Sequence, residues 1–218
     1  MRRKVSLLWA LVLAVLPSAL KIAALRARGA RIGKGCHIGL SVLNARTLVL
    51  GDHVRIGHFN LLHGLTDLTM ESGSKIEAMN WITGAGKGGL QMGRNSSIRR
   101  LHFLEASGSV KIGANSIIAG RNSLFFTHGQ APNNFNDVRP IIIGDWCYIG
   151  AATRFLPGSG VSDHSFVAMG AVITTLHKEN HVVVGGIPAR VLKTIAADAA
   201  YYRRDHLNHG HHPDGWSG

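Results

Sequence analysis

A histidine at the edge of a long polar segment is the first candidate for chemistry in this sequence. His128 ends the apolar run LFFTH, and the polar segment GQAPNNFNDVRP follows it. An unperturbed imidazole has a pKa of about 6.5, so it can take a proton from a hydroxyl or an amine at neutral pH. His128 is therefore suited to act as a general base, although a histidine in a polar loop can equally be an exposed side chain without such a role. Its second ring nitrogen needs an orienting partner, and the sequence leaves several open: Glu105, Asn122, Asn136, Asp137 or a backbone carbonyl.

A second pair of histidines raises the question of a metal site. His58 and His63 are separated by five positions. A catalytic zinc ion needs at least three convergent protein ligands and an open position, and here only the spacing of the pair is suggestive. The two side chains can equally lie exposed on a strand and a corner, so both interpretations stay open.

A six-residue period decides how these residues are positioned. An α-helix repeats every 3.6 residues and a half-buried strand every two, so neither gives this period. Three hexads make one 18-residue turn of a parallel β-solenoid, in which each hexad is a short strand and a corner. The apolar residues that define the period are Ile143, Ile149, Phe155, Val161, Val167 and Ile173.

The repeat extends backwards along the chain. Turns open at Ile32, Leu50, Met70, Met92, Ile112, Ile143 and Val161. Each opener has an aliphatic partner six residues later: Ile38, Ile56, Ile76, Ile98, Ile118, Ile149 and Val167. Extra residues must leave the solenoid as loops at its corners, and the largest excess lies between Ile112 and Ile143, around His128. Long loops on a rigid scaffold are frequent sites of function.

Three features together resemble a known family. The hexads, a histidine in a loop before IIIGDWCYIGA, and a closing GGIPARVLK are similar to the hexapeptide-repeat acyltransferases. The likeness is to the branch of maltose, galactoside and xenobiotic acetyltransferases and of exopolysaccharide O-acetyltransferases of the colanic acid type, and covers about residues 30–193. It implies an all-β, left-handed parallel β-helix, usually a homotrimer with acetyl-CoA bound between subunits. The hand comes from the resemblance alone, because parallel crossovers are ordinarily right-handed.

The resemblance also implies site residues. His128 matches the catalytic histidine of the family, with direct transfer of the acetyl group to an acceptor oxygen and a backbone N–H at the oxyanion. Tyr148 stands where the family has an aromatic wall of the donor site. The remaining matches are Ala151, Met169 and Thr174 along the pantetheine arm, and Arg190 and Lys193 near the nucleotide phosphates. No metal is expected for an acyltransferase. The γ-class carbonic anhydrases share this solenoid, so a zinc-dependent hydratase remains the alternative.

Composition limits the partners. The 218 residues are 45% hydrophobic and carry a formal charge of +12, which calls for an acidic partner or surface. The basic residues are scattered without a recognisable reading module, so we expect no nucleic acid and favour the phosphates of CoA and anionic lipid. The two cysteines, Cys36 and Cys147, fall in different coils, which argues against a disulfide and for a reducing compartment.

The first 29 residues are hydrophobic and basic. Their apolar run from Val5 to Leu20 is interrupted by Pro17 and lacks a persuasive cleavage site. Sixteen helical residues reach only about 24 Å, short of a hydrocarbon core of about 30 Å. Two compatible interpretations remain: a helix lying on the inner leaflet of the membrane, or a helix covering the exposed first coil of the solenoid.

The sequence as a whole predicts three segments: a hydrophobic helix over 1–29, the β-helix over 30–193 with a loop at 129–140, and a short helix with a disordered His-rich tail over 194–218. We expect a cytoplasmic O-acetyltransferase, associated peripherally with the inner membrane, that acts on a sugar or lipid-linked sugar in surface polysaccharide biosynthesis. A small-molecule or xenobiotic acetyltransferase is an alternative within the same enzyme class.

Overall fold

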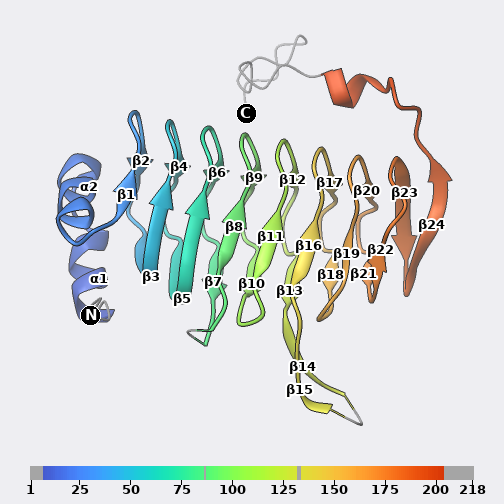
Figure 1. The fold of residues 1–218 in the computed structure, drawn as a ribbon, viewed down its shortest axis with the longest axis horizontal. Helices are drawn as coiled ribbons and strands as arrows, with labels where there is room; N and C mark the ends of the chain where they lie inside the picture. Colours follow the sequence, from blue (N-terminus) through green and yellow to red (C-terminus); the bar gives the residue numbers. More distant parts are fainter. Residues whose placement is uncertain (1–6, 86, 132–133, 204–218) are drawn as a thin grey trace.

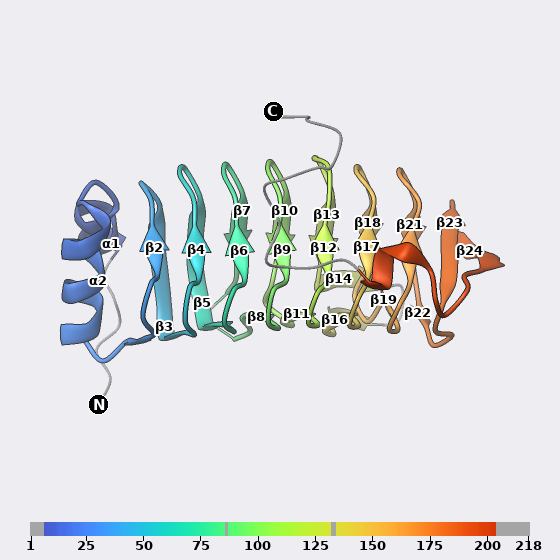
Figure 2. The same ribbon diagram turned by 90° about the horizontal axis from the view of Figure 1, so that it is seen from above.

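The chain folds into a three-sided prism of stacked coils with a helix pair at one end (Figures 1 and 2). The computed structural model describes residues 7–85, 87–131 and 134–203. Neighbouring coils pair through parallel strands, so the predicted β-solenoid is confirmed. The division into three segments stays a prediction.

The strands lie on three faces of the prism. On the first face lie β1 (Arg31–Ile32), the second halves of β3 (Val42–Leu50) and β5 (Leu61–Met70), β8 (Leu90–Met92), β11 (Val110–Ile112), β16 (Ile141–Ile143), β19 (Gly160–Val161) and β22 (Leu176–His177). On the second face lie β2 (His37–Ile38), β4 (Arg55–Ile56), β6 (Lys75–Ile76), β9 (Ser97–Ile98), β12 (Ile117–Ile118), β17 (Tyr148–Ile149), β20 (Phe166–Val167) and β23 (Val182–Gly186). On the third face lie the first halves of β3 and β5, then β7 (Trp81–Thr83), β10 (Phe103–Glu105), β13 (Leu124–Phe126), β18 (Arg154–Phe155) and β21 (Val172–Ile173).

The core consists of inward-pointing rows. Every face has an apolar row at the six-residue period, and the first face has a second one two residues earlier, formed by Leu48, Leu68, Leu90, Val110 and Ile141. Ile112, for example, pairs with Met92 in the preceding coil and with Ile143 in the next, which is the register that the six-residue period predicts. The second-face partners from Ile38 to Val167 pair in the same order and are at most 1% exposed. Aliphatic side chains, together with the rings of Phe125 and Phe155, fill this narrow interior.

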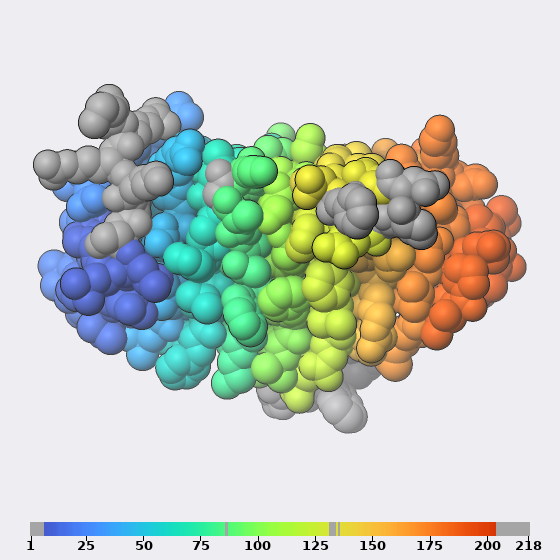
Figure 3. All heavy atoms as spheres, turned by 90° about the horizontal axis from the view of Figure 1, so that it is seen from below, coloured from blue at the N-terminus to red at the C-terminus, as the bar shows by residue number. Residues whose placement is uncertain are grey.

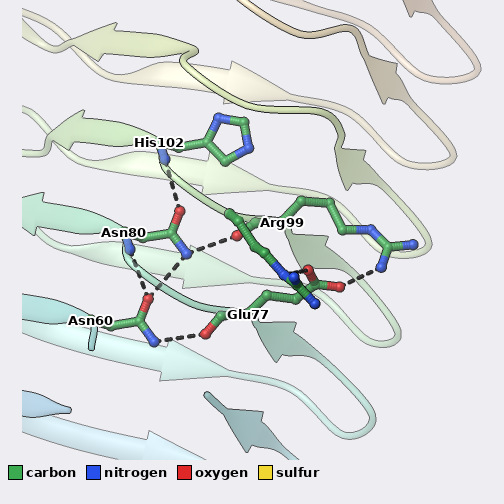
Figure 4. Close-up of polar contacts among 6 residues, drawn as sticks. Asn60, Glu77, Asn80, Arg99 and His102 are labelled. Atoms are coloured by element: carbon green, nitrogen blue, oxygen red, sulfur yellow. Dashed lines mark hydrogen bonds and ion pairs between the residues drawn. The ribbon is translucent and has the colours of Figure 1, made fainter. Parts of the chain in front are cut away.

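Polar side chains are stacked inside the corner between the second and third faces (Figure 4). Asn60 Oδ1 accepts hydrogen bonds from the backbone N–H and the side-chain amide of Asn80, both at 3.0 Å. Asn80 Oδ1 accepts from the N–H of His102, and His102 Nδ1 accepts from the N–H of Ser123 at 3.2 Å. Each coil therefore satisfies a buried backbone donor of the next coil, as buried polar groups require.

The N-terminal segment forms two helices, α1 (Leu7–Ala14) and α2 (Ser18–Ala27), separated at Pro17. They cover the open end of the first coil, where Leu13 and Leu25 join the core. Lys21 is buried beneath them and donates hydrogen bonds to the carbonyls of Ala14 and Gly39. The prediction that this segment covers the first coil is confirmed. Neither of these helices is long and apolar enough to cross a membrane, and the same holds for every other helix among the described residues.

The far end of the prism is closed differently. β24 (Ala189–Thr194) turns back and pairs antiparallel with β23. The helix expected after Lys193 is limited to one 3₁₀ turn, η1 (Ala200–Arg203), because the hydroxyls of Tyr201 and Tyr202 bond backbone carbonyls of the solenoid instead. The predicted disordered His-rich tail lies outside the described residues from residue 204 onward.

The cysteines are free, as the sequence indicates. Their thiols occupy equivalent corner positions and donate to the carbonyls of Gly51 and Ser162. Burial raises the pKa of Cys147 to about 12, so this thiol is not a nucleophile at neutral pH.

The polar corner row predicts a pH-dependent stability. Burial lowers the pKa of His102 to about 4, although the Gly120 carbonyl and the Glu77 carboxylate favour the charged form. The folded state therefore binds fewer protons than the unfolded state, so stability is lost as the pH falls from about 6.5 to about 4. His102 is 2% exposed, and its share of the loss is about 3 kcal/mol.

His102→Asn is the matched variant, because the Asn60 and Asn80 amides already perform the same bonding in earlier coils. The test is to measure the free energy of unfolding by urea at pH 7 and at pH 4. Between these pH values the variant should lose about 3 kcal/mol less stability than the wild type. Parallel stability curves for the two proteins would contradict this assignment.

Candidate active site

His128 lies where the chain leaves the prism. It is the first residue of β14 (His128–Ala131), which pairs antiparallel with β15 (Asn134–Val138). The two strands project from the prism as a hairpin (Figure 1). The predicted loop over 129–140 is therefore mainly a β-hairpin, because its backbone groups pair with each other once the six-residue period stops.

The base of this hairpin is held firmly. Inside the prism, Phe125 stacks on Phe155 with ring centroids 4.6 Å apart, and both rings are fully buried. The returning strand is fastened by the Arg139 N–H, which donates to the Thr127 carbonyl at 2.9 Å. Arg139 also makes two hydrogen bonds to the Asp137 carboxylate, at 2.6 and 2.7 Å. Asp137 is thus engaged elsewhere and does not orient His128.

Among the candidate orienting residues, the structure brings Glu105 to His128. Glu105 pairs with Phe126 in the next coil, so a residue distant in sequence lies beside the start of the hairpin. The Glu105 carboxylate is 3.8 Å from His128 Nδ1, within ion-pair range but longer than a hydrogen bond. The imidazole is 56% exposed and the carboxylate 13% exposed, so the ring is accessible to solvent while the carboxylate beside it is largely buried.

The Glu105 carboxylate is held ionised by its neighbours. Burial alone would raise its pKa, but hydrogen bonds from Ser107 and Thr127, together with the nearby His128, lower the pKa below its usual value. The Thr127 hydroxyl donates to Glu105 Oε2 at 2.9 Å, and the Ser107 N–H donates to Oε1 at 3.0 Å. Sequence reasoning missed Ser107 and Thr127, because no local pattern marks a side chain that bonds across coils.

The predicted donor residues lie on other parts of the chain. Tyr148 is on the second face, where it stacks on Phe166 at 5.5 Å. Ala151 and Met169 lie at the corner after this face, one coil apart, where the Gly170 N–H donates to the Ala151 carbonyl at 2.9 Å. Met169 is 75% exposed. Thr174 comes after β21, on the edge from which His128 departs, while Arg190 and Lys193 are in β24. Within one chain, His128 is thus separated by faces of the prism from every predicted donor residue except Thr174.

The two histidines considered for zinc do not form a ligand set with others. His58 Nδ1 accepts a hydrogen bond from the Leu40 N–H at 3.2 Å. Among the residues that the structure describes, no three His, Cys, Asp or Glu side chains are close enough together to hold a metal ion.

A row of exposed aromatic rings leads to His128 along the third face. Trp81 contacts Phe103 edge-on at 5.3 Å, and Phe103 lies 5.6 Å from Phe126. Trp81 is 54% exposed and Phe126 40%. We call Trp81, Phe103 and Phe126 the aromatic row. Contiguous apolar surface of this kind marks an interaction site on a folded protein.

An open groove of about 610 Å³ with a mixed polar and apolar lining lies on the first face. Gln91 and Lys111 line it, with Glu71 and Asp145 nearer the following corner. Amide, ammonium and carboxylate groups of this kind can hydrogen-bond to hydroxyl-rich ligands.

The clamp on Glu105 can be tested through Thr127, which is fully buried. Thr127→Val removes the hydroxyl that donates to the carboxylate and accepts from the Gly108 N–H, so we expect a loss of about 2 kcal/mol at pH 7. Because the folded pKa of Glu105 is lowered, this stabilisation is present above the unfolded pKa and is lost as the pH falls through the folded pKa. The variant should therefore approach the wild type in acid.

Thr127→Ser keeps the hydroxyl and serves as the control. Denaturant unfolding at pH 7 and pH 3 measures both effects. Equal stability of Thr127→Val and Thr127→Ser at pH 7 would show that the Thr127 hydroxyl does not stabilise the Glu105 carboxylate.

Comparison with known proteins agrees with this architecture. No family model matches the chain. The chain is 33% identical over 87 residues to a putative acetyltransferase, YvoF, of Bacillus subtilis, covering 39% of this chain and 48% of that protein. It is 33% identical over 104 residues to galactoside O-acetyltransferase of Escherichia coli, covering 45% of this chain and 51% of that protein. Each match thus spans about half of the relative's length.

Among solved structures, a hexapeptide-repeat-containing acetyltransferase of Vibrio cholerae superimposes with a TM-score of 0.50 and 18% identity, covering 86% of both chains. At this identity the likeness concerns the fold, and it agrees with the predicted left-handed parallel β-helix. The chain is therefore similar in sequence to acetyltransferases and has the fold of the hexapeptide-repeat acetyltransferases.

Proposed function

We propose that this protein is an acetyl-CoA-dependent O-acetyltransferase that acts on a sugar hydroxyl in surface polysaccharide biosynthesis. The observation that carries the proposal is the His128–Glu105 pair at the base of the hairpin. It supplies an accessible imidazole with an anionic partner on a solenoid whose relatives are named acetyltransferases.

The geometry supports general-base catalysis with direct transfer. With the proton of neutral His128 on Nδ1, facing the Glu105 carboxylate, Nε2 is left as the base. Nε2 takes the proton of the acceptor hydroxyl while its oxygen attacks the thioester carbon. Collapse of the tetrahedral intermediate breaks the carbon–sulfur bond, and the proton on Nε2 passes to the CoA sulfur. Glu105, a positioning residue, stabilises the imidazolium formed in between.

We further propose that the site is completed by a neighbouring copy in a homotrimer. Tyr148, Ala151, Met169, Arg190 and Lys193 are separated from His128 by faces of the prism, so one chain does not bring a donor site to the base. The aromatic row provides an apolar contact surface that ends two residues before His128. A copy packed on this row would place its own residues beside the imidazole.

The acceptor is proposed from chemistry. One relative is named a galactoside O-acetyltransferase, which supports a sugar hydroxyl as the acceptor group. The formal charge of +12 suits the phosphates of CoA and of a nucleotide-linked or lipid-linked sugar. Free sugars and hydroxylated small molecules are the competing acceptors.

The catalytic test uses thioester cleavage with acetyl-CoA and a panel of free, nucleotide-linked and lipid-linked sugars. His128→Ala should lower kcat by about 10²- to 10⁴-fold, because the general base is lost, while CoA binding measured by calorimetry is retained. Glu105→Gln should lower kcat by about 10-fold and leave KM little changed. Unchanged turnover of His128→Ala would remove this residue from the mechanism.

The trimer is tested by placing charges on the aromatic row. Trp81→Lys with Phe126→Lys should shift the protein from trimer to monomer in analytical ultracentrifugation, because both side chains are largely exposed in one chain. Activity should be lost with the assembly, while circular dichroism stays that of the folded solenoid. The control is Ile142→Lys, an exposed apolar position on the first face. A double variant that remains trimeric would place the interface elsewhere.

A further inference from the structure

The first helix is apolar on both of its sides. Ala10, Leu13 and Ala14 face the first coil and are at most 9% exposed. Leu8 and Val15 lie on the opposite side and are each 73% exposed, and Val12 between them is 56% exposed. A helix that is hydrophobic all round is normally buried on all sides. Contact with the first coil explains the apolar residues on the buried side of α1, but not those on its exposed side.

The uncovered side faces outward from the end of the prism. The helices α1 and α2 lie across the first coil at the end of the prism (Figures 2 and 3). The side opposite their buried residues therefore points away from the solenoid. α2 extends the same surface with Leu20, which is 59% exposed, and with Ala19 and Ala23. We call the exposed side chains of this helix pair the end surface: Leu7, Leu8, Leu11, Val12, Val15, Ala19, Leu20 and Ala23.

Positive charge accompanies the end surface, and no acidic residue stands in the same stretch of the sequence. The first 51 residues contain nine Lys and Arg and no Asp or Glu. In the described part of this segment, the exposed basic residues follow the apolar ones, at the end of α2 and on the first coil. They are Arg26, Arg28, Arg31, Lys34 and Arg46. An apolar surface with a basic border is the pattern of a protein that lies on an anionic bilayer.

We propose that the end surface inserts into the headgroup region of an anionic lipid bilayer, with the prism standing on the membrane by its first coil. A second copy is the competing occupant. Two copies meeting through this surface would bring five exposed basic residues from each copy together. The carboxylate beside them is that of Asp52, which accepts a hydrogen bond from the Lys34 N–H, so the excess of positive charge favours the bilayer. No membrane-spanning helix is needed for such attachment, since insertion of about 5–10 Å suffices.

The orientation determines how far the candidate active site lies from the lipid. His128 is in the coil opened by Ile112, the fifth from the helix pair. With coils about 4.8 Å apart and a helix layer of about 10 Å, the imidazole stands about 30 Å above the membrane. Where the protein acts as proposed above, a lipid-linked acceptor must therefore carry a glycan long enough to reach that height.

The test is flotation of the full chain with vesicles, since α1 and α2 fold against the first coil. One vesicle type contains equal parts of phosphatidylglycerol and phosphatidylcholine, and the other contains phosphatidylcholine only. The variant Leu8→Ser with Val12→Ser and Val15→Ser replaces apolar side chains that are 56–73% exposed. Its control is Ile187→Ser with Leu192→Ser, which changes side chains 77% and 61% exposed at the opposite end of the prism.

We expect the wild type and the control to float with the anionic vesicles and the triple variant to bind at least about 50-fold more weakly. The variant Arg31→Gln with Lys34→Gln and Arg46→Gln should bind the anionic vesicles about 100-fold more weakly than the wild type does. Its affinity for them should then be close to its affinity for the phosphatidylcholine vesicles. Circular dichroism checks that every variant is folded.

Equal binding of the triple variant and the wild type, or no binding by the wild type, would overturn the proposal. A triple variant that instead sediments as a smaller assembly, without vesicle binding by either protein, would assign the end surface to a second copy. Acetyl transfer to a water-soluble acceptor is measured separately, so neither result bears on the catalytic proposal.

Discussion

The structure depends on one constraint, which is that each hexad must fit its inward side chains, at the repeat position and two residues before it, into a narrow interior. The inward row from Ile38 to Val167 is one example of these rows. Backbone hydrogen bonds hold neighbouring coils together, and most of the strands that make them have only two or three residues. Such strands are too short to be stable alone, and they hold because every inner coil is paired on both sides. Insertions are therefore confined to corners, where they leave the inward rows undisturbed.

The same constraint explains the two ends. A stack of paired coils exposes unpaired strand edges at its first and last coils, and such edges invite association. The helix pair covers the first edge through Leu13 and Leu25, and β24 pairs with β23 at the last. The apolar outer side of α1 goes beyond what closure requires, which is why it points to a surface outside the molecule.

The candidate site shows how a rigid solenoid can position an exposed side chain such as His128. Glu105 is held from two sides by Ser107 and Thr127, and the stacked Phe125 and Phe155 rings fix the strand from which His128 extends. The imidazole itself projects outward at the hairpin base, so its working nitrogen is available to a ligand. Exposure on one side and a clamped anion on the other is the arrangement that general-base chemistry needs.

Much of the fold was predictable because the repeat is local. The six-residue period set the register of the inward rows, and the structure pairs Ile112 with Met92 and Ile143 as that period requires. The break in the period located the departure of the chain at His128, and the apolar first segment indicated a cover for the first coil. Each of these inferences depended only on residues close together along the chain.

The tertiary structure decided what depends on the stacking of different coils. The sequence alone left Glu105, Asn122, Asn136 and Asp137 equivalent as partners of His128, and the parallel register of Glu105 with Phe126 made the choice. Only the fold separated His128 from Tyr148 on another face, and only the packing of α1 showed which of its sides remains exposed. The physical reason is that a period specifies which side chains point inward, whereas the meeting of outward side chains depends on how many residues each corner inserts between neighbouring coils.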